Sequence, residues 1–326
     1  MMVTKETLID LKNLSIDLIN SEEDSDLVKN IIDEIHNYFR EVTEISGYDS
    51  EVKNMITLTA DKGMALSINH AAQCLLDYKR TYRFLKGFVR AILDKQKQFP
   101  NETIQILYAG CGPYAPFVTL VAPLFSPEEI QFSLLEINKS SLEKAEVLIE
   151  NLKLTNYIKA CYLSDATTFK VDKSKKYHIL FSETLDALLY RECYVPILWN
   201  LVPQFSSDVT VIPENVKVDL YFKEKSKEVF ETTIFDVRKR IELSDVNLSL
   251  PEQFKPVKVD LINASIYDKI VLSTEVQVYK SHFLKRNESS LTIALEMEIE
   301  KPIVHKSVQF TYHTNPKIEL KFTLEK

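Results

Sequence analysis

Glycine is scarce in this chain, with 5 among 326 residues, and there is a single tryptophan. We find no internal repeat and no low-complexity tract, which excludes repeat and fibrous architectures. Glycine tolerates positive φ and lets a ligand approach the backbone, so its few positions are informative. Two of the five, Gly110 and Gly112, fall in one short segment, Tyr-Ala-Gly-Cys-Gly-Pro.

Paired cysteines and long apolar runs are also lacking. The four cysteines form no Cys-x-x-Cys pair, and we expect reduced thiols in a cytoplasmic protein. The histidines lack metal-ligand spacing, so no metal site is expected. No run of 18 apolar residues occurs, and the first 20 residues contain no apolar core of a signal peptide. Neither a membrane span nor a secretory signal is therefore predicted.

The charge balance is mildly acidic, with a net charge of −7 and a pI near 5.6. Such a balance argues against a general nucleic-acid binder and slightly favours a cationic substrate. With 45% hydrophobic residues, the chain is long enough for one large domain or two smaller ones around a sizeable core.

The segment 104–116 has the pattern of a strand, a glycine turn and a helix start. Its apolar, β-branched residues end at Gly110-Cys111-Gly112, and a helix is predicted over 117–124. The free N–H groups and positive dipole at a helix N-terminus favour an anionic or polar ligand group. By itself this pattern is equally typical of an ordinary tight turn.

Three further strands are predicted over 131–135, 158–163 and 178–181, and a helix over 140–152. The polar residues that follow the strands are Glu136, then Ser164-Asp165-Ala166, then Ser182-Glu183. In open α/β sheets the ligand lies outside the carboxyl ends of the strands. A carboxylate placed like Glu136 can accept two hydrogen bonds from the vicinal diol of a ribose.

These residues resemble the cofactor motifs of the class I S-adenosylmethionine-dependent methyltransferases in order and spacing. The resemblance implies S-adenosyl-L-methionine as cofactor and S-adenosyl-L-homocysteine as product. It also implies cofactor contacts from Gly110, Gly112, Glu136, Asp165 and Ala166.

A narrower resemblance is to the protein arginine methyltransferases. Residues 182–192 read Ser-Glu-Thr-Leu-Asp-Ala-Leu-Leu-Tyr-Arg-Glu, similar to that family's double-glutamate loop. The resemblance implies that Glu183 and Glu192 are catalytic and hold a cationic substrate. Upstream, Asp-Tyr-Lys-Arg-Thr is similar to the family's Arg-Thr segment, which implies that Arg80 meets the cofactor carboxylate.

The resemblance covers residues 65–220 well, and the chain departs from it at several positions. Tyr108 replaces an acid and Tyr114 replaces a third glycine, while Leu185 and Asp186 stand where the loop has methionine and glycine. Each of the two tyrosines either lines the pocket for the adenosine or methionine part of the cofactor or only packs in the protein interior. The C-terminal part has no clear Thr-His-Trp segment. Cofactor binding is still expected, but arginine as the substrate does not follow.

Helical patterns flank the predicted sheet on its N-terminal side. Residues 1–60 are acidic and have a helical pattern. These helices form a bundle that acts as a lid or binds a partner, or they are an extension that packs on the core. Residues 64–95 are predicted to form another helical stretch.

The pattern changes after residue 213 to short segments of alternating polarity, which predict antiparallel strands. They cover 216–222, 255–261, 270–279, 291–299, 304–312 and 318–324. The resembled family also has a β-barrel there and dimerises through an arm in that part. In this chain 223–250 is either such an arm or an ordinary strand and loop.

The predicted fold is therefore α/β: a Rossmann-like methyltransferase domain with an N-terminal helical extension and a C-terminal antiparallel, barrel-like β domain. We place the extension at 1–63, the cofactor domain at 64–213 and the β domain, for substrate binding or oligomerisation, at 214–326.

The predicted activity is methyl transfer to a guanidinium or amine nitrogen of a small molecule or peptide held by the two glutamates. The alternatives are a small-molecule O-methyltransferase of a biosynthetic pathway and a non-catalytic scaffold that binds S-adenosylmethionine. The expected partner is a cationic methyl acceptor, without nucleic acid or membrane, and a homodimer is compatible with the sequence. The acceptor's identity and the number of methyl groups transferred stay open.

Overall fold

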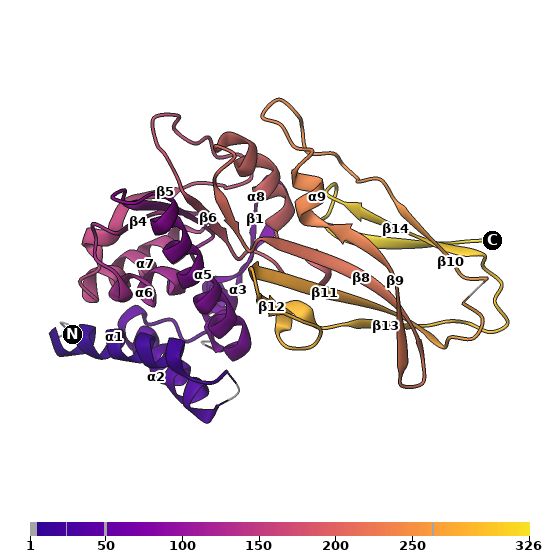
Figure 1. Cartoon of the computed structure of the whole chain (residues 1–326), viewed down its shortest axis with the longest axis horizontal. Helices are drawn as coiled ribbons and strands as arrows, with labels where there is room; N and C mark the ends of the chain where they lie inside the picture. The colour runs from indigo at the N-terminus through magenta and orange to yellow at the C-terminus, as the bar shows by residue number, and fades with distance from the viewer. Residues whose placement is uncertain (1–4, 24, 49–50, 263) are drawn as a thin grey trace.

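The computed structural model describes residues 5–23, 25–48, 51–262 and 264–326. The molecule is elongated, with the N-terminal helices at one end and the C-terminal strands at the other (Figure 1). The first two helices are α1 (Lys5–Asn20) and α2 (Asp26–Thr43). Ser25 caps α2 through its side chain, which accepts from the Val28 N–H and so satisfies one unpaired donor of the first turn.

A parallel five-stranded sheet forms the middle of the chain. Its order is β5-β4-β3-β6-β7, and every pairing within it is parallel. The strands are β3 (Ile104–Ala109), β4 (Ile130–Glu136), β5 (Ile158–Leu163), β6 (Ile179–Ser182) and β7 (Thr210–Ile212). The strand order reverses between β3 and β6, which is where an open α/β sheet leaves a crevice for a ligand. The predicted Rossmann-like fold is confirmed.

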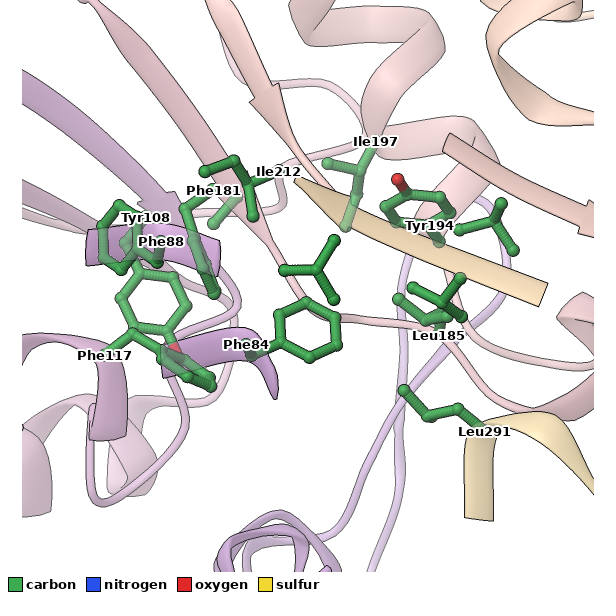
Figure 2. Close-up of a cluster of buried hydrophobic side chains, with 14 of the residues drawn as sticks. Phe84, Phe88, Tyr108, Phe117, Phe181, Leu185, Tyr194, Ile197, Ile212 and Leu291 are labelled. Carbon is green, nitrogen blue, oxygen red and sulfur yellow. The ribbon is translucent and has the colours of Figure 1, made fainter. Parts of the chain in front are cut away.

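Helices cover this sheet and bring apolar side chains onto it. They are α4 (Ile68–Gln73), α5 (Tyr78–Gln98), α6 (Pro116–Thr119), α7 (Lys139–Asn151) and α8 (Tyr194–Leu201), with the short α3 (Val52–Met55) before them. Phe84 and Phe88 of α5 meet Phe181 of β6, at ring-centroid distances of 6.0 and 4.6 Å. Figure 2 shows this cluster, which Tyr108 and Phe117 join. Its rigidity fixes the strand ends that carry the polar residues.

The C-terminal part consists of antiparallel sheets, as predicted. One sheet has the order β12-β11-β8-β9, with β13 also paired to β11, and the other has the order β10-β14-β15. The strands are β8 (Asn215–Glu224), β9 (Lys227–Asp236), β10 (Val257–Asp260), β11 (Lys269–Tyr279), β12 (His282–Leu284), β13 (Leu295–Glu298), β14 (Ser307–His313) and β15 (Glu319–Glu325). Between β9 and β10 lies α9 (Val237–Ile241). Residues 223–250 thus include the end of β8, the strand β9, the helix α9 and a loop.

The structure differs from the sequence pattern in several local elements. The strand predicted over 291–299 begins with a 3₁₀ turn at Ser290–Thr292, and two further differences lie in the central part of the chain. Residues 64 and 65 are strand, because β1 (Leu58–Thr59) and β2 (Met64–Ala65) form a hairpin whose turn contains Gly63 at φ +92°. The helix predicted over 117–124 is interrupted, since α6 ends at Thr119 and a separate 3₁₀ turn covers Ala122–Leu124. Pro123 lies in that turn and lacks the N–H that a continuous helix would use.

The N-terminal helices are packed on the central domain. Ile31, Ile32 and Phe39 of α2 are buried, and Phe39 contacts Tyr114 at a ring-centroid distance of 5.5 Å. Among the described residues, no helix has both the length and the apolar character needed to cross a membrane. The four cysteines are free thiols.

Candidate active site

A cavity at the carboxyl ends of the parallel strands contains every site residue that the sequence predicted. Its volume is about 840 Å³, including space open to solvent at its mouth. The predicted residues that line it are Arg80, Gly110, Gly112, Glu136, Asp165, Ala166, Glu183 and Glu192. The fold therefore brings together residues that are as much as 112 positions apart in the chain, from Arg80 to Glu192.

The glycine turn forms one wall. Gly110 and Gly112 have φ values of +75° and +65°, which favour glycine over residues with a Cβ. A Cβ on Gly110 would overlap with the Thr184 side chain, whereas one on Gly112 would lie 3.6 Å from the nearest atom, the Ala71 Cβ. Gly110 is thus required both by its backbone conformation and by the close approach of the loop after β6.

Glu136, at the end of β4, faces this turn. Its Oε2 accepts from the Gly112 N–H at 3.0 Å and its Oε1 accepts from the Asn138 N–H at 2.8 Å. Burial raises the pKa of this carboxyl, and the hydrogen bonds from the backbone N–H groups oppose the rise. Each carboxylate oxygen has two lone pairs, so acceptor capacity is left for ligand hydroxyls.

Asp165, after β5, is engaged in a different way. Its Oδ2 accepts from the Asp61 N–H at 2.7 Å, and its Oδ1 accepts from the N–H and the hydroxyl of Thr167 at 2.8 and 2.7 Å. Asp61 lies in the turn of the β1–β2 hairpin, between Thr59 and Met64. The Asp165 carboxylate therefore fastens that hairpin to the end of β5.

Arg80 and Glu183 form a buried ion pair. The Arg80 Nε donates to the Glu183 Oε1 at 2.5 Å, and its Nη2 donates to the Glu183 backbone oxygen at 3.5 Å. The two side chains are 6% and 8% exposed. Burial raises the pKa of Glu183, while the charge of the Arg80 guanidinium opposes that rise. The resemblance assigned these two residues to different ligands, and here they contact each other.

Glu192 is buried beside this pair. Glu192 is 9% exposed, and among the described residues no hydrogen bond or ion pair to its carboxylate is seen. Burial, followed by the charge of Asp186, raises the pKa of Glu192 to about 8. Burial also raises the pKa of Asp186 to about 6, against the influence of Arg191. The Glu192 carboxyl is therefore mostly protonated at neutral pH, and its pKa lies near the value that suits a general acid or base.

The two unusual tyrosines differ in their positions. Tyr108 lines the cavity and also packs against Phe181, at a ring-centroid distance of 4.9 Å. Tyr114 packs away from the cavity and donates its hydroxyl hydrogen to the Ile45 oxygen at 2.5 Å. Tyr108 thus fulfils both of the roles that the sequence left open, and Tyr114 only the packing role.

The sequence did not identify the β1–β2 hairpin as part of the site. Ala60, Met64, Ala65 and Leu66 line the cavity from this side. The hairpin also bonds to the loop between Glu183 and Glu192, because the Met64 N–H donates to the Arg191 oxygen at 3.1 Å. The signal in the sequence that could have indicated a turn here was Gly63, one of the five glycines of the chain. In the structure a Cβ at this position would overlap with the Ile318 side chain.

No protein-family model and no curated protein matches this chain. Among solved structures, it is similar to the Trypanosoma brucei PRMT1 enzyme–prozyme heterotetrameric complex with AdoHcy. The identity is 9%, the match covers 78% of this chain and 96% of that chain, and the TM-score is 0.47. It is also similar to Arabidopsis thaliana protein arginine methyltransferase 10 in an open conformation, with 9% identity, 78% and 97% coverage and a TM-score of 0.44.

Both identities are 9% and both TM-scores are below 0.5, so neither likeness assigns a function to this chain.

Proposed function

We propose that the chain is an S-adenosylmethionine-dependent methyltransferase that transfers a methyl group to a guanidinium or amine nitrogen of a small molecule or peptide. The observation that carries the proposal is a single cavity that joins the Gly110–Gly112 turn and Glu136 to two buried glutamates, Glu183 and Glu192. It lies where the strand order of a parallel sheet reverses, which is the usual ligand position in such sheets.

The cavity has the residues that the cofactor needs. Glu136 keeps acceptor capacity for the ribose hydroxyls, and the exposed backbone of the glycine turn allows close approach. The lining contains four carboxylic side chains and one arginine, which suits a cationic sulfonium. When bound, S-adenosylmethionine would supply an electrophilic methyl carbon.

The two glutamates are suited to hold and orient the acceptor nitrogen. Two carboxylates can take a guanidinium or ammonium through paired hydrogen bonds and so direct its lone pair. A cation that binds beside Glu192 would favour the ionised carboxylate, so Glu192 would release its proton as the acceptor enters. The ionised form is then within the same cavity to accept a proton from the nitrogen.

Arg80 would contribute from a fixed position. Its Nε and Nη2 bond to Glu183, which leaves its other N–H groups for the carboxylate end of the cofactor. In this arrangement Arg80 binds the cofactor and positions Glu183 at the same time.

A second candidate is methyl transfer to a hydroxyl oxygen. It is favoured by the same ion pair, because Arg80 neutralises Glu183 and a proton neutralises Glu192 near pH 7. The cavity is then less charged than its sequence suggests, which suits an uncharged acceptor such as a hydroxyl compound.

Calorimetric titration with S-adenosylmethionine and S-adenosylhomocysteine tests the proposal on the wild type and on Glu136→Ala. We expect binding in the micromolar range, weakened at least tenfold by Glu136→Ala because the ribose hydrogen bonds are lost. Absence of binding by folded wild type would refute the proposal. Transfer of labelled methyl to guanidinium, amine and hydroxyl compounds then separates the two candidates.

A further inference from the structure

A second groove lies next to the candidate active site and has the opposite charge. It encloses about 1890 Å³, including space open to solvent. Five lysines and three aspartates line it, in a chain whose net charge is −7. The cavity of the candidate active site, in contrast, contains four carboxylic side chains, one arginine and no lysine.

The lysines of the groove come mainly from one loop. Lys170, Lys173, Lys175 and Lys176 lie between β5 and β6 and are exposed, and Lys62 joins them from the β1–β2 hairpin. Lys175 bonds to the Tyr162 hydroxyl and Lys176 pairs with Glu102. For Lys62 and Lys173, no acidic partner is seen in the described part of the chain. These two charges are available to a ligand.

The aspartates of the groove are partly used by the protein itself. The Asp172 Oδ1 accepts from the N–H and the hydroxyl of Ser174 at 2.9 and 2.8 Å. The Asp245 Oδ1 accepts from the N–H and the side-chain amide of Asn247 at 2.9 and 3.1 Å. Hydrogen bonds within two turns therefore hold these two carboxylates in place.

Apolar side chains form part of the same groove. Trp199, Phe205, Leu248 and Leu250 line it, and the indole N–H of Trp199 donates to the Leu248 oxygen at 3.1 Å. Leu248 and the neighbouring Val246 are 55% and 58% exposed. A ligand that fits the groove would combine negative charge with apolar side chains, as an acidic peptide does.

The groove and the cavity share a thin wall. Asn200 lines the groove and donates to the backbone oxygen of Ala166, which lines the cavity, at 2.9 Å. Thr167 lines the groove and bonds to Asp165, which lines the cavity. A chain that occupies the groove would thus lie against the wall of the cavity that Asp165 and Ala166 form.

We propose that this groove binds an acidic segment of the methyl acceptor, which is then a polypeptide with a cationic side chain close to acidic residues. The cation would enter the carboxylate-lined cavity, and the acidic flank would lie along the lysines. This inference rests on the proposed function, because the ligand of the groove is a segment of the methyl acceptor. Complementary charge on both sides of one wall would fix the direction of the bound chain.

A nucleic acid fits the groove less well. The tryptophan that lines the groove is poorly placed to stack on bases. Trp199 is only 9% exposed, and it contacts Phe254 edge-on at a ring-centroid distance of 5.8 Å. The net charge of −7 also opposes a polyanion that extends beyond the groove.

The test is fluorescence anisotropy of a fluorescein-labelled peptide of ten glutamates, measured with the full chain. We expect saturable binding that weakens with salt and falls at least tenfold in Lys170→Glu/Lys173→Glu. The matched control is Lys255→Glu/Lys317→Glu, which makes the same change in net charge at two exposed positions outside the groove. We expect this control to change the affinity less than twofold.

Three results would overturn the inference: no binding of the peptide, equal losses in the two variants, or tighter binding of a ten-nucleotide oligothymidylate than of the peptide. Calorimetry with S-adenosylhomocysteine on the same proteins keeps the two proposals apart. Peptide binding without cofactor binding would refute the methyltransferase and with it the assignment to the acceptor. Cofactor binding without peptide binding would refute only the groove.

Discussion

Glu192 shows most directly how burial changes the chemistry of a single residue. In the sequence it is one of 47 acidic residues, distinguished by its spacing from Glu183. In the fold its carboxyl is buried near Asp186 and Glu183, and its pKa rises to about 8. A residue of this kind lowers stability when it ionises, which is a frequent property of catalytic groups.

Glu192→Gln should therefore stabilise the protein in alkaline solution. The ordinary pKa of Glu192 is 4.5 and the folded value is about 8. Between these values the folded chain binds more protons than the unfolded chain, so the contribution of Glu192 to stability is complete below pH 4.5 and is lost as the pH rises through 8. We expect the variant to melt about 2 °C or more above the wild type at pH 9, with little difference at pH 4.5.

The exposed Glu300→Gln is the control for this measurement, since it removes the same charge from the surface. Thermal unfolding of the three proteins across the pH range checks the prediction. A Glu192→Gln curve that runs parallel to the wild type at every pH would show that Glu192 is ionised throughout.

At the scale of an element, the β1–β2 hairpin depends on contacts distant in sequence. It has only two residues in each strand, and two-stranded hairpins are marginally stable by themselves. The Asp165 carboxylate holds its turn through the Asp61 N–H, and the Arg191 oxygen holds β2. The hairpin can therefore line the cavity only while the loop after β5 and the loop between Glu183 and Glu192 are in place.

Asp165→Ala should release this hairpin. A hydrogen bond to a charged group contributes about 1.5–3 kcal/mol, so the Asp61 amide should exchange with deuterium about tenfold faster or more. Hydrogen exchange of the peptide that covers 58–65 measures this. Thr167→Ala is the control, because it removes a hydroxyl bonded to Asp165 while the bond to Asp61 remains. Equal exchange in both variants would contradict a fastening role for Asp165.

For the whole molecule, Arg83 of α5 connects three parts of the chain. Its guanidinium bonds to Glu23, ahead of α2, with 2.6 Å between Nη2 and Oε2. It also donates to the backbone oxygen of Phe283 in β12 and lies 3.5 Å from Glu288. The side chain is 19% exposed, so these contacts are only partly screened by water. Figure 1 shows α5 between the N-terminal helices and the β domain.

Arg83→Met should lower the free energy of unfolding by about 2 kcal/mol, because charged hydrogen bonds at a partly buried site are lost. We expect tryptophan fluorescence and circular dichroism to give separate transitions, since the parts would unfold less cooperatively. Arg90→Met on the same helix is the control. That arginine is 50% exposed and pairs with Asp94 within the helix, so the change should be about 0.5 kcal/mol or less. Coincident transitions with unchanged stability in Arg83→Met would disprove the connecting role.

The sequence by itself determined the order of elements in the central domain. Alternating apolar strands and helices predict a parallel sheet because crossover helices must cover both of its faces, and the predicted strand 158–163 matches β5 at both ends. The positions of Gly110, Glu136, Asp165 and Glu183 follow from the same rule, since the carboxyl ends of parallel strands meet at one edge. Arg80 lies on α5 and Glu192 lies ten residues after β6, so this rule does not place them.

Only the tertiary structure decided which of these groups contact each other. The pairing of Arg80 with Glu183 and the contact of Asp165 with Asp61 join residues 103 and 104 positions apart, and side-chain spacing carries no information at such distances. Both strands of the β1–β2 hairpin fell within stretches predicted as helical, 1–60 and 64–95, because these short strands are stabilised by distant loops and not by a local pattern. The raised pKa of Glu192 likewise depends on burial, which the packing of the complete chain creates.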